Sequence, residues 1–508
     1  MKNALISVSN KEGIVDFAKQ LSNLGIRIIS TGNTAKLLRK NKINAALVSE
    51  ITKFPEMLDG RVKSVHPNIF AGILADRKNK THLNELKKHS IDKIDLVIIN
   101  FYPFEEALAR NKKLADTSEN IDIGGPALAR AAAKNYKDVL VVVDPKDYGN
   151  VVEKIKNKKL SEDFRLGLAT KAFSYTAKYD IIINNYFNLI AKSQFPDILN
   201  LTFKKIQDLR YGENPHQIAS FYRDLFVKES SISTAKQLQG KELSFNNILD
   251  VDAAFELVKE FEKPTAAVIK HTNPSGVASA LTIEEAYRKA HETDLKSAFG
   301  SVVALNRNCN IETAKLMQTL FIEVLICPKF EKNALEILKE KKNLRLLGTG
   351  NLKGEKIAYD IKKVSGGLLL QTDYYPKINE KNLKVVSKLE PTKEEMRALL
   401  FAWKVNKHVK SNSIVLAKED ITVGIGAGQM SRVDAVRLAV MKSEGKSEGS
   451  VMSSDAFFPF RDGIDEAAKA GVTAVIQPGG SIRDKEVIDA ANENNMAMVL
   501  TGIRLFRH

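Results

Sequence analysis

The first 143 residues alternate short apolar runs with amphipathic segments, and this alternation constrains the fold more than any other feature of the sequence. The amphipathic segments follow helical spacing, as in residues 11–24, where apolar side chains recur every three or four positions. The apolar runs have the length of buried strands and lie at residues 3–7, 26–30, 94–100 and 139–143. Strands that alternate with helices form a parallel sheet with helices on both faces. We therefore expect an α/β domain at the amino terminus.

The rest of the chain is long enough for further domains. With 508 residues, the chain exceeds what one ordinary core accommodates. Residues 192–200 lose periodicity and contain Pro196, which marks a boundary, and residues 377–389 form a polar, charged bridge. We expect three domains, over residues 1–195, 200–375 and 385–508.

Two short segments of the last two thirds recur at an offset of about 150 residues, a typical domain length. Residues 297–300 (SAFG) resemble residues 454–458 (SDAFF), and residues 325–328 (LICP) resemble residues 475–478 (VIQP). Because the order is the same in both copies, we interpret the last two domains as structurally similar halves that pack together.

The composition is that of a soluble globular protein, with 44% hydrophobic and 27% charged residues. No apolar run approaches the length of a membrane span, and the first ten residues lack the apolar core of a signal peptide. The two cysteines, Cys309 and Cys327, are too few for a disulfide scaffold or a cysteine-rich zinc site. These features predict a cytoplasmic protein without a membrane segment.

The formal charge of +16 is compatible with two kinds of partner. A basic chain of this sort suggests nucleic acid. Much of the excess lies in Lys-rich helical segments with interspersed acids, and no aromatic-basic array of the base-stacking kind is present. Anionic small-molecule substrates explain local basic clusters equally well, so nucleic acid remains the second interpretation.

Residues 267–276 (AVIKHTNPSG) place two side chains of catalytic type beside a loop. The apolar AVI segment ends a buried strand, residues 273–276 are typical of a turn, and Lys270 and His271 lie where the strand leaves its sheet. Ligands bind at such strand ends in open α/β sheets. A neighbouring ammonium disfavours the imidazolium, so His271 would tend to be a neutral base near pH 7. The alternative is a solvated loop with a chance Lys-His pair.

Several polar segments of the first third also follow strands. Residues 30–34 (STGNT) connect a strand to a helix, where free N–H groups and the helix dipole favour a phosphate. The alternative is an ordinary helix start capped by Thr34. Further polar or basic segments lie at residues 60–67 (GRVKSVHP), 100–103 (NFYP) and 121–126 (IDIGGP). Their recurrence at equivalent positions suggests one anionic pocket.

The last domain offers a possible carbonyl-orienting amide and an aromatic corner. Asn412, in the SNS segment before a strand, could orient a carbonyl, although a capping asparagine is the commoner use. Residues 424–428 (GIGAG) suggest dinucleotide binding, but Gln429 stands where the fingerprint needs Gly or Ala, so we reject NAD. Residues 453–462 (SSDAFFPFRD) suit a flat aromatic ligand or an ordinary core corner.

Together these segments resemble the AICAR transformylase/IMP cyclohydrolase family of purine biosynthesis, over essentially the whole chain. The motifs that carry the resemblance include GRVKSVHP, NFYPF, IDIGGP, RYGENPHQ, KHTNPSG, SNS, GIGAGQMSR, SSDAFFPFRD and the terminal RLFRH. The resemblance implies a methylglyoxal-synthase-like parallel-sheet domain that closes formyl-AICAR to IMP. It further implies two tandem cytidine-deaminase-like α/β subdomains that transfer a formyl group from 10-formyltetrahydrofolate to AICAR. The zinc signature of the deaminases is absent, so no metal is expected.

The resemblance also implies roles for individual residues. For formyl transfer these are His271 as the base and Lys270 and Asn412 at the formyl oxygen. For ring closure the catalytic positions are Lys63, Tyr102, Asp122 and Lys134. Substrate-binding positions are Ser30, Thr31, Gly32, Asn33, Thr34, Arg61, Ser64, Gly124, Gly125, Arg210, Tyr211, Asn214, Gly300, Phe457, Pro459, Asp462, Arg504 and His508. The sequence departs from the family at Asn33, where a second glycine is usual, but Asn tolerates left-handed backbone well.

The resemblance implies a homodimer with transformylase sites at the subunit interface. AICAR, formyl-AICAR, IMP and reduced folate would be its ligands, without nucleic acid or membrane partners. Two alternatives remain: a basic RNA-binding protein, and a degenerate enzyme kept as a nucleotide sensor.

Overall fold

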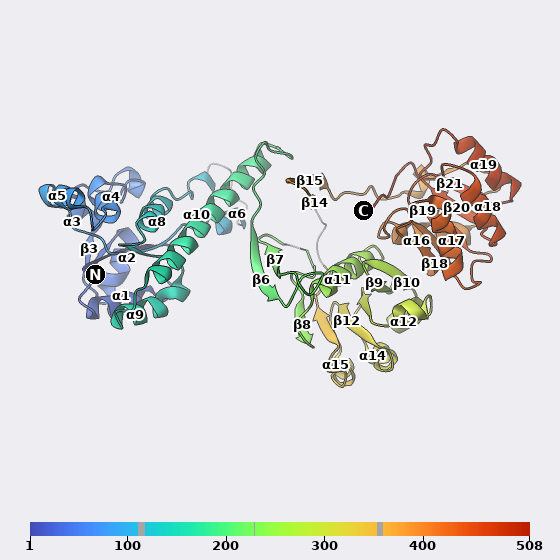
Figure 1. The fold of residues 1–508 in the computed structure, drawn as a ribbon, viewed down its shortest axis with the longest axis horizontal. Helices are drawn as coiled ribbons and strands as arrows, with labels where there is room; N and C mark the ends of the chain where they lie inside the picture. Colours follow the sequence, from blue (N-terminus) through green and yellow to red (C-terminus); the bar gives the residue numbers. More distant parts are fainter. Residues whose placement is uncertain (110–116, 228, 353–358) are drawn as a thin grey trace. The chain divides into compact units, whose positions relative to one another are not determined.

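The computed structural model describes residues 1–109, 117–227, 229–352 and 359–508. The chain forms two compact units, Met1–Thr202 and Phe203–His508 (Figure 1). No helix in these ranges is long and apolar enough to cross a membrane.

The first unit is built on a five-stranded sheet in the order β3-β2-β1-β4-β5, and every pairing is parallel. This confirms the expected parallel sheet. The strands are β1 (Asn3–Val8), β2 (Arg27–Ser30), β3 (Ala45–Leu47), β4 (Leu96–Asn100) and β5 (Leu140–Val142). All five residues of β4 are buried, because a central parallel strand is covered on both faces.

Helices surround this sheet, and the longest, α10, packs against α8 and β5 (Figure 1). The longer helices are α1 (Ile14–Asn23), α2 (Gly32–Lys40), α4 (Pro67–Leu74), α5 (Lys80–Lys88), α8 (Gly124–Lys134), α9 (Tyr148–Lys156) and α10 (Glu162–Ile190). The shorter ones are α3 (Val48–Thr52), α6 (Phe104–Ala109), η1 (Leu58–Gly60) and η2 (Pro145–Asp147).

The second unit contains a twelve-stranded mixed sheet that joins two halves through the pairing of β10 with β18. The first half contributes β8 (Lys236–Gln239), β9 (Thr265–Lys270), β10 (Asn273–Ser279), β11 (Ser301–Leu305), β12 (Ile322–Cys327) and β13 (Arg345–Gly348). The second contributes β16 (Lys384–Val385), β17 (Ile414–Lys418), β18 (Ile421–Gly426), β19 (Val451–Ser454), β20 (Ala474–Gln477) and β21 (Ala497–Leu500). Two hairpins lie outside this sheet: β6 (Phe203–Leu209) with β7 (Ala219–Asp224), and β14 (Tyr359–Val364) with β15 (Gly367–Thr372).

The two halves have the same topology, read outward from the β10/β18 junction. Each has an antiparallel hairpin, then three strands joined by parallel pairings, then an antiparallel edge strand. The LICP and VIQP segments occupy equivalent positions, at the ends of β12 and β20. The other pairing of segments is wrong, because SAFG ends just before β11 begins, whereas SDAFF starts at the last residue of the equivalent strand β19. The similarity of these two short segments therefore does not reflect equivalent positions. The strand order nevertheless supports two structurally similar halves.

Helices cover both faces of the large sheet. On one face α11 (Phe245–Val258) and α16 (Lys393–Asn406) share a single apolar core that spans both halves. On the other face each half has its own core. That of the first half lies under α12 (Ile283–His291), α14 (Ile311–Gln318) and α15 (Lys332–Leu338), and that of the second under α17 (Arg432–Lys442), α18 (Asp462–Lys469) and α19 (Asp484–Glu493). The short helices are α13 (Leu295–Ala298) and η3 (Glu380–Asn382).

Candidate functional site

The carboxyl edge of the first sheet gathers several of the predicted polar segments. Because all five strands are parallel, the residues that follow β1, β2 and β4 meet at one edge. The strand order reverses direction between β1 and β4, which is where ligands bind in open α/β sheets. Asn100, at the end of β4, accepts the N–H groups of Ser9 (2.5 Å) and Asn10 (2.8 Å) with its Oδ1. It therefore fixes the loop after β1 at this reversal point.

The segment at residues 30–34 begins helix α2 earlier than the sequence predicted. Thr31 is the N-cap, and Gly32, Asn33 and Thr34 form the first turn. The Thr34 N–H donates to the Thr31 carbonyl at 3.1 Å, so the N–H groups that this turn offers to a ligand are those of Gly32 and Asn33. The Ser30 hydroxyl donates to the Ile6 carbonyl at 2.7 Å, and Thr34 donates to the Val8 carbonyl at 3.1 Å. An anion here would thus meet backbone N–H groups rather than these two buried hydroxyls. Asn33 is helical, so its tolerance of left-handed backbone is not needed.

Lys11 is a candidate functional residue that the sequence did not single out. Its ammonium donates to Thr34 Oγ1 at 2.8 Å and to the Val8 carbonyl. Burial lowers the pKa of Lys11, and the nearby Lys63 ammonium lowers it further. Lys11 therefore places a cation at the start of α2, within electrostatic reach of Lys63 in the GRVKSVHP segment. Its only signal in the sequence was its position directly after an apolar strand.

Asp122 is the electrostatic centre of this edge. Its Oδ1 accepts the Gly125 N–H at 2.8 Å, and its Oδ2 accepts the Tyr102 N–H at 3.4 Å. Burial raises the pKa of Asp122, and the two hydrogen bonds and the charge of Lys63 offset only part of that rise. The structure thus places Asp122 against the Tyr102 backbone and within electrostatic reach of Lys63, while Tyr102 is 48% exposed.

Close approaches explain both glycines after Asp122. A Cβ at Gly124 would lie 3.0 Å from the Ser64 hydroxyl, so the predicted Ser64 and Gly124 are neighbours. A Cβ at Gly125 would lie 2.6 Å from Asp122 Oδ2 and 2.9 Å from the Phe101 ring. Contacts this short require movement of the carboxylate or the ring.

Replacing Gly125 by Ala is expected to displace Asp122 and to destabilise the protein by about 1–3 kcal/mol through overpacking. The control is Gly149→Ala in α9, where an added Cβ meets nothing within 4 Å and helix propensity favours Ala by up to about 1 kcal/mol. Thermal unfolding of both variants is the measurement. Equal unfolding temperatures for the two variants would contradict this account of Gly125.

Arg61 and Lys134 lie apart from the Asp122 cluster. Arg61 forms an ion pair with Glu119 at 2.6 Å, with both side chains largely exposed. Lys134 is exposed at the last residue of α8, while Gly124 is the first, so about 15 Å of helix separates them. A role for either residue needs a substrate that reaches it or a movement of its side chain.

In the second unit, the Lys270-His271 pair lies at the tip of the β9–β10 hairpin. Lys270 pairs with Asn273, so His271 and Thr272 form a two-residue turn with φ of 53° and 63°. The expected turn at residues 273–276 is wrong, because these residues begin β10 with an irregular register between Pro274 and Gly276. Proline and glycine mark a bulge here, where a Cβ at position 276 would lie 1.9 Å from the Ala290 carbonyl oxygen.

A second residue missed by sequence reasoning, Asp250 of α11, holds this turn. Its Oδ1 accepts the Thr272 N–H at 2.6 Å, and its carboxylate also accepts the His271 N–H. Burial raises the pKa of Asp250, which these hydrogen bonds and His271 partly offset. Asp250 is far from the turn in sequence and carries no local signal for this contact.

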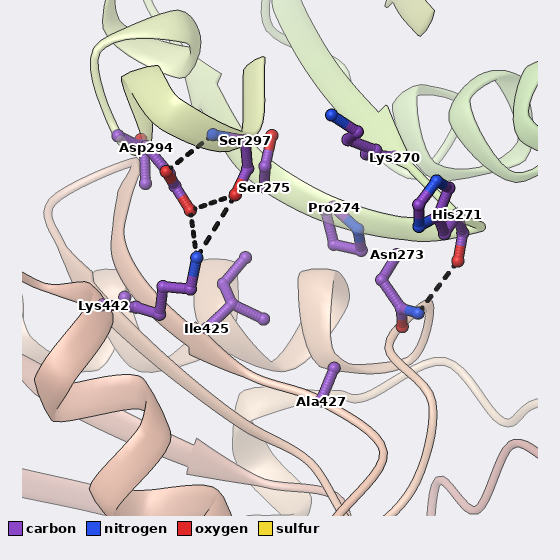
Figure 2. A pocket seen from close by; sticks show the side chains of 12 residues that line it. Lys270, His271, Asn273, Pro274, Ser275, Asp294, Ser297, Ile425, Ala427 and Lys442 are labelled. Carbon is purple, nitrogen blue, oxygen red and sulfur yellow. Dashed lines mark hydrogen bonds and ion pairs between the residues drawn. The ribbon is translucent and has the colours of Figure 1, made fainter. Parts of the chain in front are cut away.

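Lys270 and His271 line a cavity of about 210 Å³ formed by both halves of the unit (Figure 2). The Lys270 ammonium donates to the Phe299 carbonyl at 2.9 Å. Ile425, Ala427 and Lys442 line the cavity from the second half. The pair therefore borders a half-open pocket with polar and apolar lining at the junction of the halves, with Lys270 half-buried and His271 exposed.

The structure places Asn412 near this hairpin, with its amide engaged by its own chain. Asn412 Nδ2 donates to the carbonyls of Gln429 (2.9 Å) and Met430 (3.1 Å), and its Oδ1 accepts from Arg432 at 2.7 Å. Arg432, another residue missed from the sequence, is buried in an ion pair with Asp455. The link to the hairpin is Asn273, whose Oδ1 accepts the N–H of Lys410 at 3.0 Å. Asn412 is thus rigidly held two residues from the hairpin contact.

The remaining predicted binding residues lie in separate segments. Of the three phenylalanines in the DAFFPF corner, Phe458 is buried in the core, whereas Phe457 and Phe460 are exposed. Among the described residues, none of this group forms a hydrogen bond or ion pair with Lys270 or His271. Gly300 comes closest in sequence, directly after Phe299, and has φ of 70°. The group comprises Arg210, Tyr211, Asn214, Gly300, Phe457, Pro459, Asp462, Arg504 and His508.

Two of these segments have internal contacts that fix their side chains. The Arg210 guanidinium lies 5.1 Å from the centre of the Tyr211 ring, and that of Arg504 lies 4.5 Å from the Phe506 ring. At the end of the chain, the His508 carbonyl accepts from Lys362 at 3.0 Å. Exposed cations stacked on aromatic rings suit a planar anionic ligand.

Comparison with known proteins gives end-to-end matches. A family described as AICARFT/IMPCHase bienzyme matches residues 132–442, and one described as MGS-like domain matches residues 13–127. The bifunctional purine biosynthesis protein PurH of Caldicellulosiruptor saccharolyticus is 52% identical over 100% of both chains. PurH of Thermoanaerobacter sp. is 53% identical, also over 100% of both chains. A solved structure titled Crystal structure of ForH has 32% identity, covers 37% of this chain and 97% of its own, and gives a TM-score of 0.34.

Proposed function

Because the chain belongs to the AICARFT/IMPCHase bienzyme family, we propose that its two units divide the family's two reactions between the sites described above. The protein is a bifunctional enzyme of purine biosynthesis, with AICAR transformylase and IMP cyclohydrolase activities. Its ligands are AICAR, formyl-AICAR, IMP and a formyl-folate co-substrate. We take the donor to be 10-formyltetrahydrofolate and the enzyme to be cytoplasmic.

Formyl transfer belongs to the cavity of the second unit. The 5-amino nitrogen of AICAR attacks the formyl carbon, His271 removes the proton of the amine, and the bond to folate N10 breaks as N10 takes up a proton. The Lys270 ammonium stabilises the negative charge on the formyl oxygen. Asn412, held by Arg432, orients the formyl group when its Nδ2 exchanges the contact with the Gln429 or Met430 carbonyl for the formyl oxygen. The observation that carries this proposal is the placement of Lys270 and His271 together at the wall of one cavity.

Ring closure belongs to the carboxyl edge of the first sheet. The carboxamide nitrogen of formyl-AICAR attacks the formyl carbon, and the formyl oxygen leaves as water. Asp122 and the Tyr102 phenol exchange the protons, and Lys63 supports the developing charge. The 5′-phosphate binds the N–H groups at the start of α2 together with Lys11. Arg61, Ser64, Gly124 and Lys134 complete the site once substrate is bound.

We expect the enzyme to be a homodimer in which the second units meet. Support comes from large apolar side chains that are exposed on the two outlying hairpins, among them Phe203, Tyr222, Tyr359 and Leu369. Apolar surface of this kind marks an interaction site. A partner chain would also bring Arg210, Phe457 or Arg504 to the cavity, as transformylase sites at the interface require.

The test is conversion of AICAR and 10-formyltetrahydrofolate to IMP by the purified chain, followed by absorbance. Supplying formyl-AICAR alone isolates the second reaction. Turnover in both assays supports the proposal. RNA binding that weakens steeply with salt, in the absence of turnover, would instead support the RNA-binding alternative. Nucleotide binding in the absence of turnover would support the nucleotide sensor.

A further inference from the structure

We propose that Lys442, contributed by the second half, is a positioning residue for formyl transfer. It holds Asp294 and, through helix α13, places the Phe299 carbonyl against the Lys270 ammonium. This inference rests on the role proposed above for Lys270.

The first link crosses the junction between the two halves. The Lys442 ammonium, at the end of α17, contacts Asp294 Oδ2 at 2.9 Å and Ser297 Oγ at 3.2 Å (Figure 2). Asp294 and Ser297 belong to the first half, and all three residues line the same cavity as Lys270. Lys442 is therefore a side chain of one half that fixes a segment of the other beside the site.

The second link is the one-turn helix α13. Asp294 is its N-cap, with Oδ1 accepting the Ser297 N–H at 3.0 Å and Oδ2 accepting the Ser297 hydroxyl at 2.7 Å. A helix of four residues has almost no stability of its own, so its position depends on this cap. Phe299 follows directly, and its carbonyl accepts from Lys270 at 2.9 Å. A displaced Asp294 thus displaces the acceptor that orients Lys270.

The electrostatics make Asp294 dependent on Lys442. The Asp294 side chain is only 13% exposed. Burial tends to raise the pKa of Asp294, but hydrogen bonds from Ser297 and Lys442 outweigh this effect and lower it below the ordinary value. The carboxylate is therefore charged at neutral pH and loses its counterion if Lys442 is removed. An uncompensated carboxylate at low exposure turns towards water and releases the cap.

A second ion pair between the same two regions provides a matched control. Lys296, on α13, contacts Glu444, just after α17, at 3.1 Å. These side chains are 86% and 64% exposed, so solvent screens the pair and its removal should change little. Lys296 and Lys442 thus offer the same chemical substitution at the same junction, with different expected results.

The experiment compares Lys442→Met, Lys442→Arg and Lys296→Met in the full-length enzyme. Lys442→Met should lower kcat of formyl transfer by about 10- to 100-fold, because small displacements of a catalytic group have effects of this size. KM for AICAR should change less than about threefold, since no substrate contact is removed. Lys442→Arg should restore most of kcat, and Lys296→Met should behave as the unmodified enzyme. Thermal unfolding reports that the second unit of each variant is folded, and ring closure of supplied formyl-AICAR should be unchanged because it uses the other unit.

The decisive comparison repeats Lys442→Met in a Lys270→Ala background, at enzyme concentrations that give measurable residual turnover. If Lys442 acts through Lys270, adding Lys442→Met to the Lys270→Ala variant should reduce kcat of formyl transfer by less than about twofold. An equal loss in both backgrounds, or unchanged kcat in Lys442→Met alone, would overturn the inference while leaving the role of Lys270 intact. Unchanged transfer in Lys270→Ala alone would instead overturn the assignment of Lys270, and with it both proposals.

Discussion

Replacing His271 by Ala is expected to lower kcat of formyl transfer by about 10²- to 10⁴-fold, the usual contribution of a general base. Ring closure of supplied formyl-AICAR should be unchanged, because Asp122 and its neighbours belong to the other compact unit. The amine of AICAR is a weak nucleophile, and the substitution removes the imidazole that is proposed to take up its proton.

The backbone at His271 calls for a second variant. Its φ of 53° is unfavourable for Ala, so part of any loss in His271→Ala could come from a distorted hairpin tip. Asn adopts this conformation readily but cannot serve as a base near neutral pH, so His271→Asn should lose transfer to the same extent. A variant that keeps transfer within about threefold of the unmodified enzyme would rule out His271 as the base.

The control is His291→Ala, on helix α12 of the same unit. His291 contacts the Tyr287 ring and does not line the cavity, so both activities should persist. Steady-state assays of each half-reaction on all three variants, with thermal unfolding as a check of folding, complete the test. Loss of both activities in a folded His271 variant would contradict the division of the reactions between two sites.

Much of the first unit was predictable because its signals are local. A parallel strand buried on both faces reads as a continuous apolar run, and β4 is such a run. Polar residues at the ends of those runs, such as Asn100, were then expected at one edge, and the parallel pairing puts Asn100 there. Asp122 lies just before α8 and contacts this edge through the Tyr102 N–H. The exact start of α2 was missed, because glycine and asparagine in its first turn resemble a loop.

The hairpin of the second unit shows where local reading fails. Proline and glycine at residues 273–276 suggested a turn, but the chain reverses at His271 and Thr272. Thr272 is β-branched and therefore unfavourable at positive φ, and the Asp250 carboxylate on α11 stabilises the reversal by accepting the N–H groups of His271 and Thr272. Asp250 and Thr272 are 22 residues apart in the sequence. Only the fold reveals their contact.

The same limit applies to the charged residues that support each site. Lys11, Arg432 and Lys442 look like ordinary surface charges in the sequence. The structure shows that each contacts a segment distant in sequence: Lys11 contacts Thr34, Arg432 contacts Asn412, and Lys442 contacts Asp294. Catalytic residue types can be suspected from a motif, whereas the residues that hold them in place are defined by tertiary structure.

Replacing Asp122 by Asn is expected to lower kcat of ring closure by about 10²- to 10⁴-fold, with formyl transfer unchanged. The amide keeps the shape of the carboxyl group, and its oxygen still accepts the Gly125 N–H, but it cannot take up a proton at the pH of the reaction. Asp16→Asn, on an exposed position of α1, is the control and should leave both activities intact. Loss of formyl transfer in Asp122→Asn would contradict the assignment.

The same substitution should change how the stability depends on pH. Burial raises the pKa of Asp122 above that of the unfolded chain. As pH rises between these two pKa values, the unfolded state releases its proton first, so the free energy of unfolding falls, and the loss is complete above the folded pKa. Asn does not titrate and escapes this loss. Calorimetric unfolding of the full-length enzyme from acidic to neutral pH should therefore show the variant gaining stability over the unmodified enzyme as pH rises. A gain that shrinks as pH rises would mean that Asp122 is better stabilised as a carboxylate in the folded enzyme than in water, and would remove the physical basis for its service as a proton acceptor.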